Sequence, residues 1–104
     1  MSDTQIIGQI KTELTMIKRL ININEWEASR PHLTKVKELC DGLSNQEFAK
    51  VVKQRTTTLV DITGLQSALV TNDHIEQLNK FIDAAKNLKG KELLRVQLSD
   101  FRNI

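Results

Sequence analysis

Residues 6–21 read IIGQIKTELTMIKRLI, and apolar side chains return in this stretch at alternating intervals of three and four. Those intervals follow the 3.6-residue turn of an α-helix, so one side of the segment is hydrocarbon and has to be buried against other helices. The stripe consists of Ile7, Ile10, Leu14, Ile17 and Ile21. The same spacing recurs at Ile75, Leu78, Ile82 and Ala85. Two such stripes in one short chain indicate a helical bundle.

The composition fits one all-α domain. The chain has 104 residues, of which 39% are hydrophobic and 27% charged, and this balance is typical of a globular protein. Three Phe and one Trp leave an aliphatic core, and four Gly with one Pro leave little material for a turn-rich β fold. We expect an antiparallel bundle of four to five helices over residues 1–104. Residues 91–104 either complete that bundle or form a separately docked C-terminal segment.

The first helix is expected to begin at an Asp3 or Thr4 cap and to end near Asn22. Asn24, with Glu27 three residues later, reads as a capping box for a second helix.

Pro31 leaves two models of that second helix open. Either one helix from Asn24 is kinked at the proline, or a fresh helix starts with Ser29 as its cap. The stripe that runs from Trp26 to Leu43 keeps its phase across the proline, which favours the single kinked helix. Gly42 is expected just past its end in a left-handed conformation.

Residues 44–47, Ser-Asn-Gln-Glu, read as a capping box for a long third helix that carries apolar side chains as far as Leu69. Gly64 predicts a bend in it, and Arg55 and Gln66 fall close to its apolar stripe, which indicates a partly buried face.

Residues 71–73, Thr-Asn-Asp, are the expected cap of a fourth helix, which runs from Ile75 to Leu88 and ends at Gly90. The segment Lys91–Ile104 fits either a short helix or a strand. A helix is favoured because an isolated strand would have nothing to pair with.

No residue pattern predicts catalysis. His32 and Cys40 lie eight positions apart, which is about 12 Å along a helix and too far for a base to activate a thiol. His32 is therefore interpreted as a surface residue, Cys40 as a small core residue, and His74 as an ordinary residue of a first helical turn. The glycines are isolated, and no His, Cys or carboxylate spacing matches a metal site. We expect no enzymatic activity, no cofactor and no metal.

The chain begins without the basic start and apolar run of a signal peptide, and no stretch approaches the ~20 apolar residues of a membrane span. One cysteine cannot form an internal disulfide. These features predict a cytoplasmic protein with no membrane partner.

Basic residues gather toward the C-terminus, although the formal net charge is only +2. The candidate basic surface comprises Lys86, Lys89, Lys91, Arg95 and Arg102, with a smaller group at Lys50, Lys53 and Arg55. We interpret these residues as solvated helix faces, because aromatic platforms for single-stranded nucleic acid are missing. Nucleic acid and, after it, an acidic protein partner remain alternatives.

Apolar residues that follow Gly90 are the strongest candidates for a partner-binding surface. They can complete the bundle, dimerise, or cover a groove that a partner helix would otherwise fill. Trp26 is either a packing anchor or an interface hot spot. The candidate partner-binding residues are Trp26, Leu93, Leu94, Leu98 and Phe101.

Residues 24–27, Asn-Glu-Trp-Glu, stand between the Ile7–Ile21 stripe and a second stripe from Leu33 to Leu43. In this arrangement the chain resembles the FliT family of flagellar export chaperones over roughly residues 5–88. The resemblance implies an antiparallel, often dimeric bundle that binds the helical C-terminal part of the filament-cap protein. It also implies a last helix that covers the partner site, a role that would fall on Leu94, Leu98 and Phe101, and a further role in regulating motility through a transcriptional activator.

The favoured function is therefore a non-catalytic chaperone or adaptor that shields a partner helix in an apolar groove. One alternative is a structural or regulatory homodimer with the first-helix stripe as its interface. The other is a nucleic-acid-associated accessory protein that uses the C-terminal basic residues.

Overall fold

The structure, a computed structural model, describes residues 1–99 and confirms an all-α bundle with a short C-terminal helix. No strand occurs among these residues. The helices are α1 (Asp3–Asn22), α2 (Trp26–Cys40), α3 (Gln46–Thr63), α4 (Ala68–Ala85) and α5 (Gly90–Gln97).

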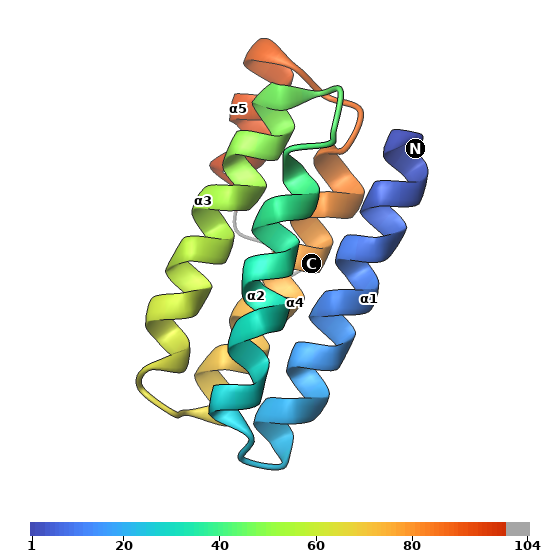
Figure 1. Ribbon diagram of the computed structural model, residues 1–104. Coiled ribbons are helices and arrows are strands. Elements are labelled where there is room, and N and C mark those ends of the chain that lie inside the picture. Colours follow the sequence, from blue (N-terminus) through green and yellow to red (C-terminus); the bar gives the residue numbers. More distant parts are fainter. Residues whose placement is uncertain (100–104) are drawn as a thin grey trace.

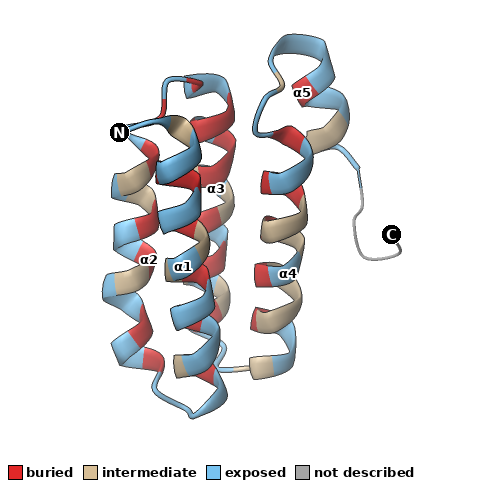
Figure 2. Ribbon diagram, turned by 90° about the vertical axis from the view of Figure 1, so that its right-hand side faces the viewer, coloured by how far each residue is buried: buried red, intermediate tan, exposed pale blue. Residues whose placement is uncertain are grey.

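Helices α1 to α4 run alternately down and up, and each packs against the next (Figure 1). Contacts between α1 and α4 close the ring of four. The short helix α5 folds back beside the upper end of α4 and also touches α3. Figure 2 shows that the buried residues lie along the inward faces of the four long helices.

The core is aliphatic, as expected, with one aromatic pair near the end of the bundle where α3 begins and α4 ends. The predicted stripe of α1 is buried along its length, and Leu14, Ile17 and Ile21 have no exposed surface. Each such side chain stabilises the fold by roughly 1.5–3 kcal/mol. The rings of Phe48 on α3 and Phe81 on α4 stack with their centroids 5.9 Å apart.

The first helix ends at Asn22 as predicted, but its cap lies earlier than expected. The hydroxyl of Ser2 accepts from the Gln5 backbone N–H, and the Gln5 side chain accepts from the Ser2 N–H. Asp3 instead accepts from the backbone N–H and the hydroxyl of Ser44. These two hydrogen bonds hold the pKa of the Asp3 carboxyl below its usual value and tie α1 to the loop before α3.

The predicted capping box at Asn24 is wrong. Asn24 has a φ of 62°, a left-handed conformation that lets the chain reverse between α1 and α2, and Glu25 precedes the helix without a side-chain cap. Pro31 lies inside one unbroken helix, so the single-helix model is correct. Ser29 is not a cap, since it is buried within α2 and donates to the Trp26 carbonyl.

Two glycines have roles other than the predicted ones. Gly42 does not have a positive φ. Its position favours a small residue because Ile6 of α1 packs against it, and an added Cβ would lie 3.2 Å from the Ile6 Cδ1. Gly90 does not end the fourth helix, which stops at Ala85. With a φ of +60°, it turns the chain into α5.

The prediction of one long third helix is also wrong, because α3 ends at Thr63 and a new helix begins after Ser67. Gln66 adopts a φ of 52° in the connection. Ser67, rather than residues 71–73, caps α4 by accepting from the Val70 N–H. At the other end of α3, the predicted box at Ser44 is replaced by Asn45, whose side chain accepts from the Phe48 N–H.

The helical alternative for the C-terminal segment is correct as far as Gln97. Phe101 and Arg102 lie outside the described residues. Within residues 1–99, no helix has both the length and the apolar character needed to cross a bilayer.

Candidate functional site

The predicted partner-binding residues do not form one surface. Trp26 is 9% exposed and lies at the start of α2, at the end of the bundle opposite α5 (Figure 1). Leu93 is 5% exposed and faces the bundle, whereas Leu94 and Leu98 are 53% and 78% exposed. Of the predicted set, only α5 therefore presents an apolar outer surface among the described residues, and Trp26 is a core residue.

Helix α5 docks through a narrow apolar edge. Leu93 is its one buried residue, and the partly buried Val96 packs against the same core three positions later. The spacing of three places both side chains on the face that meets α3 and α4.

Arg55 on α3 holds the end of α5. Its guanidinium lies over the Phe81 ring, 4.5 Å from the centroid, and donates to the Gln97 carbonyl at 2.9 Å. Burial lowers the pKa of Arg55, although a guanidinium stays charged throughout the physiological range. The sequence placed Arg55 near a partly buried face, but it gave no sign of the bond to a residue 42 positions away.

The loop before α5 is tied to the beginning of α3. The Asn45 side chain donates to the Leu88 carbonyl at 3.0 Å, and the Gly90 N–H donates to Glu47 at 2.8 Å. Helix α5 is thus held at its start by polar bonds, in its middle by Leu93, and at its end by Arg55.

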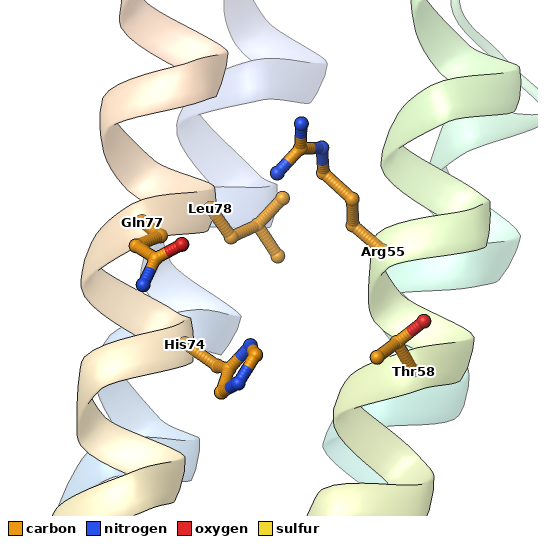
Figure 3. Close-up of a pocket in the computed structure, with 5 residues that line it drawn as sticks. All are labelled: Arg55, Thr58, His74, Gln77 and Leu78. Carbon is orange, nitrogen blue, oxygen red and sulfur yellow. The ribbon is translucent and has the colours of Figure 1, made fainter. Parts of the chain in front are cut away.

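A pocket of about 220 Å³ lies between α3 and α4 beside Arg55. Figure 3 shows Arg55 and Thr58 on one wall facing His74, Gln77 and Leu78 on the other. These groups can donate and accept hydrogen bonds, but the lining residues within 1–99 include neither a carboxylate nor a thiol. No cluster of three or more His, Cys, Asp or Glu residues within residues 1–99 is arranged to hold a metal ion.

The two residues considered for nucleophilic chemistry have structural contacts instead. Cys40 is fully buried, and this burial raises the pKa of its thiol to about 11. The thiol is therefore protonated and shielded near neutral pH. His32 is not a simple surface residue: its Nδ1 lies 2.6 Å from a Glu13 carboxylate oxygen, and the pair joins α2 to α1.

The candidate basic surface contains both positively and negatively charged side chains. The described members Lys86, Lys89, Lys91 and Arg95 are exposed around the turn from α4 to α5. Carboxylates occupy the same elements at Asp83 and Glu92, and Asp3 is close enough for Lys89 to lower its pKa. The smaller basic group divides, since Arg55 turns toward α4 while Lys50 and Lys53 line a groove on the α2 side.

The α1 stripe, which was the expected interface of a homodimer, is buried inside a single chain. It is therefore not available for pairing with a second copy in this structure.

Comparisons with known proteins identify no relative of this chain. No family model matches the chain, and neither a curated protein nor a solved structure shows significant similarity to it.

Proposed function

We propose that the protein is a non-catalytic chaperone or adaptor, and that α5 is a displaceable cover over the site for a partner helix. The observation that carries this proposal is the imbalance of α5: one leucine is buried while Leu94 and Leu98 remain exposed. A helix docked in this way is the part of a bundle expected to open first.

Displacement of α5 would uncover an apolar strip between α3 and α4. Leu93 and Val96 of α5 now pack against this strip. Arg55, which lies over Phe81, marks its end beside the last residue of α5. A partner helix with apolar residues three positions apart, followed by a free carbonyl for Arg55, would reproduce these contacts. This is helix-in-groove recognition, in which burial of apolar area supplies about 25 cal/mol per Å².

The resemblance to flagellar export chaperones gives this proposal a biological setting. The partner helix would then be the C-terminal part of a filament-cap protein, shielded before export. The setting rests on residues 24–27 and the flanking stripes alone.

The test is to delete residues 91–104 and to supply the missing helix as a peptide. We expect the truncated protein to keep most of its helical circular dichroism and to bind a labelled peptide spanning Leu88–Ser99. A peptide with Leu93→Asp should not bind, and the full chain should bind the native peptide far more weakly because its own α5 competes.

Two results would contradict the proposal. Loss of most helical signal on truncation would show that α5 is an integral part of the core. Equal binding of the peptide to the full and truncated chains would show that α5 covers nothing that the peptide uses.

A further inference from the structure

A shallow groove of about 500 Å³ runs between α2 and α3 on the side of the molecule away from α4. Five lining residues come from α3, at intervals that place them on one face, and the sixth comes from α2. The lining residues are Lys37, Gln46, Lys50, Lys53, Gln54 and Thr57. Three of them are lysines and none is a carboxylate.

A second interhelical groove shows that this charge pattern is not general. The groove between α1 and α4 is lined by two lysines and two aspartates, so its charges cancel. Lys11 and Asp83 pair directly across it.

In the α2–α3 groove, only Lys53 has a carboxylate partner among residues 1–99, which is Asp41 at 2.6 Å. Lys37 and Lys50 have none there. Among the described residues, the groove therefore carries two positive charges without a carboxylate partner, beside amide and hydroxyl groups.

From this charge pattern we propose that the α2–α3 groove binds an acidic, extended peptide segment of a partner protein. The lined part of α3, from Gln46 to Thr57, is about 16 Å long, since an α-helix rises 1.5 Å per residue. An extended segment of about five residues covers that length. Its side chains alternate in direction, so Asp or Glu at every second position would face the lysines while Gln54 meets its backbone.

A peptide fits these observations better than a nucleic acid does. The part of the chain that the structure describes contributes no aromatic side chain to the lining on which a base could stack. Asp41 at the upper edge would repel a continuous row of phosphates, whereas a peptide can place a neutral residue there. The site does not depend on α5, because the lining residues of the groove come from α2 and α3.

The experiment measures the binding of the full chain to a fluorescent peptide of roughly eight residues that alternates Asp and Ser, by anisotropy at low ionic strength. We expect the double variant Lys37→Gln, Lys50→Gln to weaken binding roughly tenfold, because each exposed ion pair contributes up to about a factor of five. The matched control is Lys18→Gln, Lys35→Gln, which removes the same charge from exposed positions outside the groove. It should change binding less than about twofold.

A gain of binding provides a test that unfolding cannot mimic. Asp41→Asn frees Lys53 and removes the one carboxylate paired with a groove lysine, so it should tighten peptide binding by about two- to fivefold. The proposal is overturned if the two double variants lose binding equally, if Asp41→Asn has no effect, or if the unmodified chain does not bind the peptide. Tighter binding of a single-stranded oligonucleotide of equal charge would also overturn it, in favour of a nucleic-acid surface.

Discussion

Arg55 should determine how firmly α5 is docked. We consider Arg55→Met, which keeps a long side chain in place but removes the charge and its donors. The hydrogen bond to the Gln97 carbonyl has a charged donor, and such bonds contribute about 1.5–3 kcal/mol. The cation–π contact with Phe81 adds about 0.5–2 kcal/mol.

Arg55→Met also removes the free-energy cost of burying a charged guanidinium. Burial lowers the pKa of Arg55, which means that the surroundings disfavour its charge, and methionine is free of that desolvation. We therefore expect a net loss of about 1–2 kcal/mol in α5 docking, well below the sum of the two contacts. The population of chains with α5 undocked should rise about five- to thirtyfold.

Native-state hydrogen exchange resolves this effect from general destabilisation. The amide of Leu98, bonded to the Leu94 carbonyl within α5, should exchange faster by that factor, while core amides of α1 change little. Gln54→Met on the exposed side of α3 is the control and should leave α5 unaffected. The reasoning is refuted if the α5 amides of Arg55→Met exchange at the native rate, or if every amide accelerates equally.

Four further substitutions test the core and the helices. Thr71 has a fully buried hydroxyl with no hydrogen-bond partner among residues 1–99, so Thr71→Val should raise the free energy of unfolding by about 1 kcal/mol in urea titrations. Thr56→Val, which removes a satisfied hydroxyl, should lower it by about 0.5–1.5 kcal/mol, and the opposite order would contradict this assignment. Gly8→Ala should raise the melting temperature through a gain of about 0.5–1 kcal/mol, since open space surrounds its Cβ position; a loss would show that another group approaches α1 there. The raised pKa of Cys40 favours the folded state below the thiol's ordinary value of 9.0, and this stability disappears as pH rises from 9 to about 11. Native protein should accordingly lose about 2–3 kcal/mol more than Cys40→Ala over that interval, and parallel pH curves would exclude such a contribution.

The apolar stripes of α1 and α4 predicted the fold class correctly because their burial follows directly from helical periodicity. Ile7, Ile10, Leu14 and Ile17 are all buried, and the same holds for Ile75 on α4. In these segments local spacing and tertiary packing require the same conformation.

The boundary between α3 and α4 was not predictable from the same signal. Leu65 and Leu69 continue the apolar spacing of α3, yet they are 72% and 83% exposed. The chain breaks at Gly64 and restarts after Ser67, so that Thr71 enters the core instead. Ser67 and residues 71–73 are both acceptable helix caps by local sequence. Which of them starts α4 depends on how α4 packs against the other three helices.

The docking of α5 was beyond sequence reasoning for a different reason. Its contacts join residues more than forty positions apart, such as Asn45 with Leu88 and Arg55 with Gln97. Hydrophobic spacing within residues 90–97 identifies an apolar edge but does not say which helix receives it. The sequence of residues 90–97 is therefore compatible with a cover, a dimer contact or a core helix, and only the fold distinguishes them.

Helix α3 carries both proposed binding surfaces, and its geometry keeps them independent. Lys50 and Arg55 are five residues apart, so they point about 140° from each other around an α-helix roughly 10–12 Å in diameter. At such a separation the effects of two substitutions usually add within about 0.3–0.5 kcal/mol. Combining Arg55→Met with Lys50→Gln should therefore weaken acidic-peptide binding no more than Lys50→Gln alone and open α5 no more than Arg55→Met alone. A measured coupling above about 1 kcal/mol in either assay would show instead that occupation of the α2–α3 groove is transmitted through α3 to its C-terminal cover.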